Sequence, residues 1–329
     1  MVLASSVSAA LSFALIWLLI PLLQRYALAR PNARSSHKIP TPQGGGIAVI
    51  AATLIAAIAF VGLEGSFGSQ IPAIVVVATF VMAALGAADD IKSIPVLPRL
   101  IAQATAVGAI VLIAPSEFRI VPVCPFWIER GILLLAGVWF VNLVNFMDGL
   151  DWMTVAEVVP ITAALVALGY TGLLSPGATM LAATLGGALL GFAPFNRPVA
   201  KVFLGDVGSL PIGLILGWCL LELAYQGHIV AALLLPLYYL ADATVTMLCR
   251  LFAGKKVWVA HRSHFYQRAT DNGYSVNMVV GRVFGLNALL VGLAIASALT
   301  ASIIVNAIAA IAGVVGVAAV MAAFARPRG

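Results

Sequence analysis

The sequence predicts an all-α, polytopic membrane protein, and its composition and its long apolar runs carry that prediction. Of its 329 residues, 62% are hydrophobic and only 9% are charged, and the mean hydropathy is +1.09. A soluble domain of this length does not reach such values. Because a helix satisfies its backbone hydrogen bonds internally, apolar segments in lipid are expected to fold as a helical bundle.

About eleven apolar runs have the roughly 17–25 residues that a membrane-spanning helix needs. They fall at 3–23, 44–62, 71–88, 99–115, 131–147, 154–174, 177–194, 208–224, 229–249, 281–301 and 303–324. The longest polar stretch is 250–280, so we expect residues 1–329 to form a single integral-membrane domain. No Lys or Arg precedes the first run, which is also longer than the apolar core of a signal peptide, so we expect it to be a helix.

Lys and Arg divide unequally between the two sets of alternate loops. One set holds only Arg119 and Arg130, and the other holds the remaining 16 of the 18. Since cytoplasmic loops are rich in these residues, we expect a periplasmic N-terminus and a cytoplasmic C-terminus. The net charge of +6 follows from this bias and suits anionic lipid headgroups, so it does not indicate nucleic-acid binding. The three cysteines are dispersed, which indicates neither a disulfide framework nor a thiolate metal site.

Acidic residues gather at the breaks on the basic side. Eight of the 12 lie there: Asp89, Asp90, Asp148, Asp151, Glu157, Asp206, Asp242 and Asp271. A carboxylate at a membrane boundary is costly to keep ionised unless another charge compensates it. A metal ion and the basic residues of the same face are the candidate partners. The pattern indicates an enzyme that handles phosphates at the inner surface of a membrane.

The adjacent Asp89 and Asp90 end the third apolar run, where the helix dipole already disfavours negative charge. Lys92 offsets only part of that cost. A divalent cation, or a proton shared by the two groups, would resolve the conflict. The alternative is a pair of solvated loop residues.

The stretch NLVNFMDGLD, residues 142–151, repeats oxygen-bearing side chains every three residues. They are Asn142, Asn145, Asp148 and Asp151. Neighbours at this spacing lie side by side on a helix, and Gly149 is expected to end that helix. Such oxygen ligands suit a hard cation such as Mg²⁺. Glu157 is expected in the first turn of the next helix, where its main role would be to cap.

Two further loops carry candidate phosphate-binding groups. Asp206 precedes the run 208–224, where it can serve as an N-cap or can hold a metal while nearby backbone N–H groups bind phosphate. Gly205 and Gly208 would permit such a close approach. The first cytoplasmic loop, PNARSSHKIPTPQGGG at 31–46, is expected to be irregular, with its glycines near a ligand or simply at a helix start.

The largest loop contains His261 and His264, flanked by Arg262 and Arg268. No third soft ligand lies near the histidines, so a basic pocket for phosphate is favoured over a zinc site. The alternative is a cationic segment that rests on lipid headgroups. Asp242 lies about two turns before Arg250 on the same face, so these two residues could form an ion pair.

Together these stretches resemble the polyprenyl-phosphate N-acetylhexosamine-1-phosphate transferase family, glycosyltransferase family 4, and in particular its O-antigen-initiating branch. The matching stretches are PNARSSHKIPTPQGGG, AADDIK, NLVNFMDGLD, FNRPVAKVFLGDVGSLPIG and HRSHFYQR. They follow the family's order between residues 31 and 268, and all fall in loops assigned to the cytoplasm.

The resemblance implies a Mg²⁺-dependent reaction, in which Mn²⁺ can substitute, at the cytoplasmic face of the bacterial inner membrane. An N-acetylhexosamine 1-phosphate moves from a UDP-sugar to undecaprenyl phosphate, UMP leaves, and a lipid-linked envelope glycan such as O-antigen begins. The sugar stays open among GlcNAc, FucNAc and QuiNAc, and so does the oligomeric state, a homodimer being one option.

The resemblance also implies roles for individual residues. Catalytic roles fall on Asp89, Asp90 and Asp148, and metal binding falls on Asp206 and Asp148. Substrate binding falls on Asn145, Asp151, Phe203, His261, Arg262 and His264.

Two positions depart from the family's pattern. Trp152 stands where a glycine is common, and Ala29 stands where an aspartate often precedes the first loop. The main alternative function is a membrane transporter of an anionic or nucleotide-linked substrate. Transporters typically carry their carboxylates near the midplane, whereas here only Glu222 and Asp242 fall within late spans. A nonenzymatic scaffold is less favoured, because it would not need so many unpaired acids.

Overall fold

The computed structural model describes residues 1–29, 40–63, 71–256, 259 and 261–328. Much of the predicted first loop, residues 31–39, lies outside the described residues. Arg30, Arg34 and Lys38, which contribute to the expected charge asymmetry, lie outside them as well.

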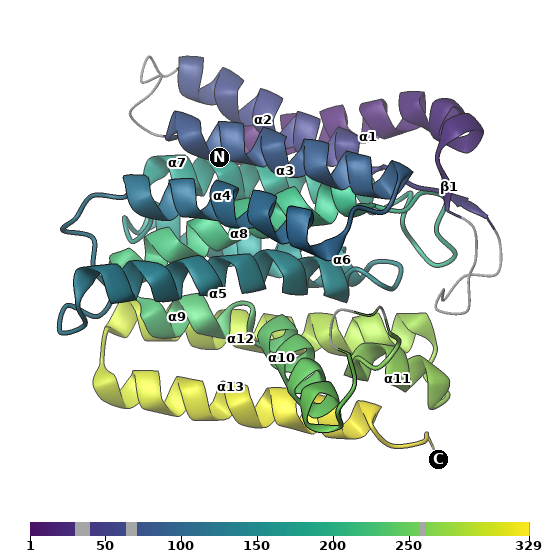
Figure 1. Cartoon of the computed structure of the whole chain (residues 1–329). Coiled ribbons are helices and arrows are strands. Elements are labelled where there is room, and N and C mark those ends of the chain that lie inside the picture. The colour runs from purple at the N-terminus through teal and green to yellow at the C-terminus, as the bar shows by residue number, and fades with distance from the viewer. Residues whose placement is uncertain (30–39, 64–70, 257–258, 260, 329) are drawn as a thin grey trace.

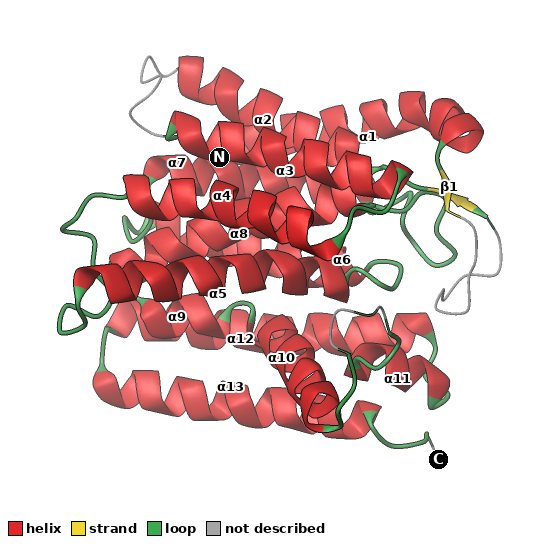
Figure 2. Cartoon of the chain, viewed as in Figure 1, coloured by secondary structure: helices red, strands yellow, loops and turns green. Residues whose placement is uncertain are grey.

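The chain is a bundle of helices, as predicted, and is a multi-pass membrane protein (Figures 1 and 2). Within the described residues, nine helices are long and apolar enough to span a membrane: α1 Val2–Tyr26, α2 Gly46–Leu63, α3 Ala73–Ile91, α4 Val96–Ile113, α5 Phe126–Met147, α6 Met153–Tyr170, α8 Asp206–Tyr225, α12 Val276–Thr300 and α13 Ile303–Phe324. Shorter helices are α7 Pro176–Phe192, α9 Ile229–Leu234, α10 Leu237–Phe252 and α11 Phe265–Asp271.

The predicted span 229–249 is wrong as one continuous helix. It divides into α9 and α10, with Leu235 and Pro236 between them. Proline has no backbone N–H to donate within a helix and its ring clashes with the preceding turn, so a helix breaks there. Beyond the break, α10 runs obliquely to its neighbours (Figure 1).

The helices α7 and α8 form the centre of the bundle. Helix α7 packs against α1, α2, α6 and α8, and α8 packs against α2, α3, α5, α7 and α9. Most residues of both helices are buried, 15 of 17 in α7 and 15 of 20 in α8. The first turn of α8, which begins with Asp206, is therefore surrounded by the ends of other helices.

Glycines allow α2 and α3 to touch the first turn of α8 directly. A Cβ atom added to Gly46 would lie 2.3 Å from the Gly208 Cα, and one added to Gly86 would lie 2.2 Å from the Asp206 backbone oxygen. Small residues permit such backbone contacts between helices in a membrane. This packing brings the carboxyl end of α3 to the amino end of α8.

A short strand pair anchors the chain before α2, where an irregular loop is expected from the sequence. The antiparallel strands are β1 Leu28–Ala29 and β2 Thr41–Pro42. The carbonyl of Phe203 then accepts hydrogen bonds from the N–H groups of Gly44 at 3.2 Å and Gly45 at 2.9 Å. The start of α2 is thus tied to the loop before α8.

Candidate active site

The structure brings together carboxylates from three helix ends. Asp89 and Asp90 lie in the last turn of α3, Asp206 is the first residue of α8, and Asp148 follows the last residue of α5. The Asp206 carboxyl group lies close enough to those of Asp89 and Asp90 to interact with both. Asp148 lies close enough to Asp90 and Asp206 to feel their negative charge. Four carboxylates therefore form one group, the carboxylate cluster, which consists of Asp89, Asp90, Asp148 and Asp206.

Asp90 binds the backbone at the start of α8. Its carboxylate accepts hydrogen bonds from the N–H groups of Asp206 at 2.9 Å and Val207 at 3.1 Å. It also accepts one from the Gln43 side chain. The negative carboxylate thus meets the positive end of the α8 dipole. The free N–H groups that were expected to hold phosphate are engaged by Asp90 instead.

The N-cap role expected for Asp206 is wrong. Gly205 is the N-cap of α8, and Asp206 is its first helical residue. The Asp206 side chain instead accepts a hydrogen bond from Asn145 Nδ2 at 2.8 Å, and the same nitrogen lies 2.8 Å from Ser209 Oγ. Asn145 thereby links the end of α5 to the start of α8.

The guanidinium group of Arg99 lies beside Asp89. Its carboxylate accepts hydrogen bonds from Arg99 Nη1 at 2.9 Å and from the backbone N–H of Ile94 at 2.6 Å. Lys92, which the sequence suggests as the compensating charge, is exposed. Arg99 is a site residue that sequence reasoning missed, because it belongs to the following helix and lies ten positions away.

Burial and the neighbouring carboxylates raise the pKa of Asp148 from 3.8 to about 8. Burial is the larger cause, and the charges of Asp206 and Asp90 add to it. Thr154 partly opposes the rise, because its hydroxyl donates a hydrogen bond to Asp148 Oδ1 at 2.5 Å. The crowding of like charges favours either a proton or a compensating positive charge at this place.

The donor chemistry of this cluster fits a hard divalent cation. Its oxygens come from Asp89, Asp148 and Asp206, and Mg²⁺ prefers carboxylate and carbonyl oxygen ligands. In the described part of the chain, no three His, Cys, Asp or Glu side chains are placed so that they could hold a metal ion by themselves. Mg²⁺ usually retains several waters and shares its coordination with substrate phosphates, so a closed cage is not required.

Asp151 and Phe203 lie where the loop before α8 meets neighbouring segments. Asp151 is 4% exposed, and its carboxylate accepts a hydrogen bond from the Ala200 N–H at 3.0 Å. Phe203 holds the start of α2 through its backbone, as described above. Both residues shape the loop that leads to Asp206, and their expected roles in nucleotide binding remain predictions.

The departure at Trp152 has a structural explanation. Its φ is +63°, in the left-handed region that favours glycine. Trp152 offsets this strain with two hydrogen bonds: its backbone N–H donates to Asn196 Oδ1 at 2.8 Å, and its indole Nε1 donates to the Ala193 carbonyl at 2.6 Å. The indole therefore anchors the α5–α6 junction to the segment after α7.

The segment 261–266, which contains His261 and His264 and is called the histidine loop below, docks beside the carboxylate cluster. The Tyr266 hydroxyl donates a hydrogen bond to the Phe146 carbonyl at 2.9 Å, two residues before Asp148. Gly149 permits this contact, since a Cβ atom there would lie 2.1 Å from the same hydroxyl. Tyr266 lies within the stretch HRSHFYQR, but the sequence does not predict its contact with Phe146, which is 120 positions away.

His264 and His261 lie together in this loop, and their rings stack with centroids 5.0 Å apart. Burial, with the nearby His264 and Arg250, lowers the pKa of His261 to about 4, so its ring is neutral near pH 7. Arg262 forms an ion pair with Asp271 at 3.1 Å. Asp271 is the last residue of α11, and its exposed side chain pairs with Arg262.

Two alternatives considered for acidic residues are wrong. Glu157 does not cap α6: it lies beyond the first turn, is 1% exposed, and accepts a hydrogen bond from Asn287 Nδ2 at 2.6 Å. Asp242 does not pair with Arg250, whose guanidinium contacts Ser263 and the Lys256 carbonyl. Asp242 turns instead toward the histidine loop.

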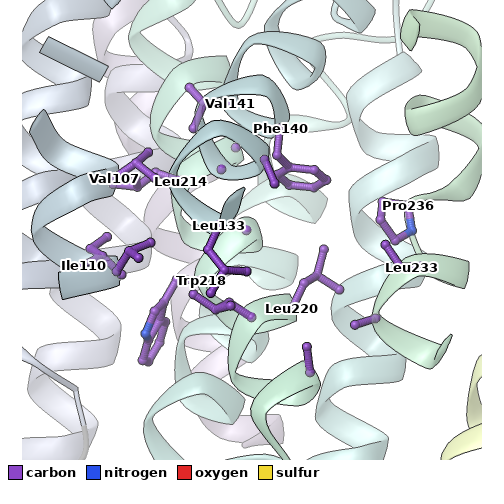
Figure 3. Close-up of a pocket in the computed structure, with 18 of the residues that line it drawn as sticks. Val107, Ile110, Leu133, Phe140, Val141, Leu214, Trp218, Leu220, Leu233 and Pro236 are labelled. Atoms are coloured by element: carbon purple, nitrogen blue, oxygen red, sulfur yellow. The ribbon is translucent and has the colours of Figure 1, made fainter. Parts of the chain in front are cut away.

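An apolar cavity of about 200 Å³ lies within the bundle near the cluster (Figure 3). It is lined from α4, α5, α8, α9 and α10, and its lining includes Phe140, Val141, Leu214, Trp218 and Pro236. Val141 lies one helical turn before Asn145 on α5. The cavity therefore begins about one turn from the carboxylate cluster, on the side of the apolar core.

Fold and site define a class: a polytopic helical membrane protein with an acidic site at its helix ends, flanked by a histidine- and arginine-bearing loop. The sequence profile of glycosyl transferase family 4 matches residues 72–224. The decaprenyl-phosphate N-acetylglucosaminephosphotransferase of Mycobacterium leprae is 30% identical over 291 residues, which cover 77% of this chain and 72% of the relative. This chain therefore belongs to glycosyl transferase family 4.

Other relatives have related names. The decaprenyl-phosphate N-acetylglucosaminephosphotransferase of Mycolicibacterium smegmatis is 29% identical over 80% of this chain and 73% of its own length. A probable undecaprenyl-phosphate N-acetylglucosaminyl 1-phosphate transferase of Bacillus subtilis is 25% identical over 83% of this chain and 81% of its own length. The family and these relatives support a transferase and do not favour a transporter.

Proposed function

We propose that this protein transfers an N-acetylhexosamine 1-phosphate from a UDP-sugar to undecaprenyl phosphate and releases UMP. The observation that carries the proposal is the meeting of three features at one place. The carboxylates of α3, α5 and α8 lie beside the docked histidine loop and about one helical turn from the apolar cavity. Such a junction can receive a water-soluble phosphate donor and a lipid phosphate together.

In the proposed reaction, an oxygen of the lipid phosphate attacks the phosphorus that carries the sugar. The bond between this phosphorus and the oxygen of UMP breaks, and UMP leaves with that electron pair. A phosphate monoester already has a nucleophilic oxygen near neutral pH. The protein therefore acts mainly by positioning the two phosphates and balancing their charge.

We assign Mg²⁺ binding to Asp206 and Asp148, with Mn²⁺ as a substitute. A bound Mg²⁺ supplies charge neutralisation to the phosphates of donor and acceptor. Asn145 orients the Asp206 carboxylate, and Asp90 fixes the first turn of α8 on which Asp206 stands. Asp89, held by Arg99 and facing Asp206, would orient the lipid phosphate.

We assign the sugar-diphosphate part of the donor to His261, Arg262 and His264. Arginine can bind phosphate oxygens with two parallel hydrogen bonds. Asp151 and Phe203 would border the uracil, since both shape the loop before α8. The apolar cavity would accept part of the acceptor's prenyl chain, because apolar side chains line it (Figure 3).

The charge asymmetry of the loops supports an active site on the cytoplasmic face of a bacterial inner membrane, with the N-terminus in the periplasm. The stretch HRSHFYQR supports a role in starting a lipid-linked glycan such as O-antigen. We also propose that the transferred sugar is GlcNAc, FucNAc or QuiNAc. A homodimer is the oligomeric state that we propose.

The test is turnover by the purified protein in lipid nanodiscs. We expect UMP and a lipid diphosphate–sugar product when undecaprenyl phosphate, Mg²⁺ and the correct donor from a panel of UDP-GlcNAc, UDP-FucNAc and UDP-QuiNAc are all present. Omitting the lipid phosphate should stop UMP release. The proposal fails if no donor gives UMP while liposomes that contain the protein accumulate a nucleotide sugar, which would support the transporter instead.

A further inference from the structure

Asp242 is a fully buried acid outside the carboxylate cluster. It lies in α10, is 0% exposed, and has five hydrogen-bonding partners. Two come from its own helix: the hydroxyls of Tyr238 at 3.1 Å and Thr246 at 3.3 Å. A buried carboxylate is stable when several donors satisfy its oxygens.

The other three partners belong to the histidine loop. The backbone N–H groups of Phe265 and Tyr266, at the start of α11, donate to Asp242 at 3.0 and 3.1 Å. The third is His264 Nδ1, at 3.2 Å from Asp242 Oδ1. One carboxylate therefore fixes both the backbone of the loop and the ring of its second histidine.

The contact with Asp242 favours one tautomer of His264. Because a carboxylate accepts hydrogen bonds, a proton on Nδ1 would be donated to Asp242, whereas a bare Nδ1 would face it without a hydrogen bond. In the neutral ring Nε2 then has a free lone pair and is the nitrogen available to a ligand. The ring cannot easily turn, because it lies between the rings of His261 and Tyr266, with centroids 5.0 and 5.8 Å away.

The same anchor reaches the carboxylate cluster through Tyr266. Asp242 holds the Tyr266 backbone, and the Tyr266 hydroxyl binds the Phe146 carbonyl beside Asp148. Displacing Asp242 would therefore move His264 and the docked loop relative to the acids.

We propose that Asp242 is a positioning residue, which presents His264 with Nε2 directed to the phosphates of the donor and keeps the histidine loop docked against the α5–α6 junction. This inference rests on the proposed function, since it assigns His264 to the donor. It adds a residue that acts on the substrate only through His264 and the loop.

A double-mutant cycle tests the inference. In the wild-type background, Asp242→Asn should lower kcat/KM by ~10- to 100-fold, as expected for a residue that orients a ligand-binding side chain. In a His264→Gln background the same change should cost less than ~2-fold, because the residue it orients is already gone. Equal losses in both backgrounds would overturn the inference.

Matched controls separate positioning from general packing. Thr246→Val and Tyr238→Phe each remove one donor to Asp242 but leave its contact with His264. We expect both to retain kcat/KM within ~3-fold of the wild type. Losses as large as that of Asp242→Asn would show that packing of α10, rather than the orientation of His264, sets the rate.

A second measurement remains decisive if Asp242→Asn fails to fold. The chain has four histidines, so ¹⁵N-histidine labelling gives few signals, and His264→Gln assigns the relevant one. We expect the signal of a ring protonated at Nδ1; protonation at Nε2 would overturn the inference. This readout needs no turnover, so an inactive wild type would break the proposed function alone.

Discussion

The two ends of α5 carry charged groups in opposite arrangements. At its start, Arg130 is 3% exposed and donates to the carbonyls of Val111 and Pro115 and to the Tyr225 hydroxyl. The adjacent Glu129 is paired with Arg119. At its end, 18 residues and ~27 Å away, Asp148 lies among carboxylates of its own sign.

The two ends therefore differ in how well their charges are balanced. Around Arg130 opposite charges and acceptors match, so the network stabilises the fold. Around Asp206 like charges crowd together and Arg99 balances only part of them. A protein retains such charge repulsion where it serves a ligand. Removing a charge should therefore lower protein stability at the Arg130 end, and should leave it unchanged or raise it at the Asp206 end.

The largest expected effect is on activity at the acidic end. Asp206→Asn keeps the hydrogen bond from Asn145 but removes a charge, so we expect turnover to fall ~1,000-fold or more as metal binding is lost. The thermal unfolding temperature should stay level or rise. As a control, Glu117→Gln, an exposed acid near the other end, should change neither quantity. Retained turnover in Asp206→Asn would remove this residue from the site.

Arg130→Met tests the opposite end. It leaves buried carbonyls and the Tyr225 hydroxyl without a donor, so we expect a loss of about 3 kcal/mol in the free energy of unfolding. Thermal unfolding in detergent measures this loss. Activity per folded molecule should remain near the wild-type value. A stable but inactive variant would mean that this end also takes part in catalysis.

Gly46→Ala connects packing to the site. The added Cβ would lie 2.3 Å from the Gly208 Cα, so α2 and α8 must separate. We expect a loss of about 1–3 kcal/mol in stability and a drop in turnover, since Asp206 moves with α8. Gly131→Ala is a matched control, because nothing lies within 4 Å of its added Cβ. Equal behaviour of the two variants would contradict the close contact.

The sequence alone predicts the helices well, but it does not predict the break before α10 or the contacts of the acidic residues. Hydropathy predicts the helices, because each span is a local property of about twenty residues. Hydropathy does not predict the break before α10, although Pro236 marks it, because the apolar run continues across that proline. The sequence indicates the acidic loops as candidate sites but not their contacts, since Asp90 meets the α8 backbone 116 positions away.

The smallest expected effect concerns pH. The pKa of His261 is about 4 in the folded protein, against an ordinary 6.5, so the unfolded chain binds the extra proton between these values. The contribution of His261 to the free energy of unfolding is therefore fully present above pH 6.5, and it is lost as the pH falls toward 4. The wild-type unfolding temperature should fall relative to that of His261→Gln over this range. A constant difference would contradict the neutral ring.

We claim that the carboxylates at the end of α5 and the start of α8 lie so close together because a divalent cation completes the site. The direct measurement is the unfolding temperature of the wild type and of Asp206→Asn, with and without Mg²⁺ at constant ionic strength. We expect the variant to match or exceed the wild type without Mg²⁺, and Mg²⁺ to raise the unfolding temperature of the wild type alone. Equal stabilisation of both proteins by Mg²⁺, or a variant that is less stable without it, would contradict the claim.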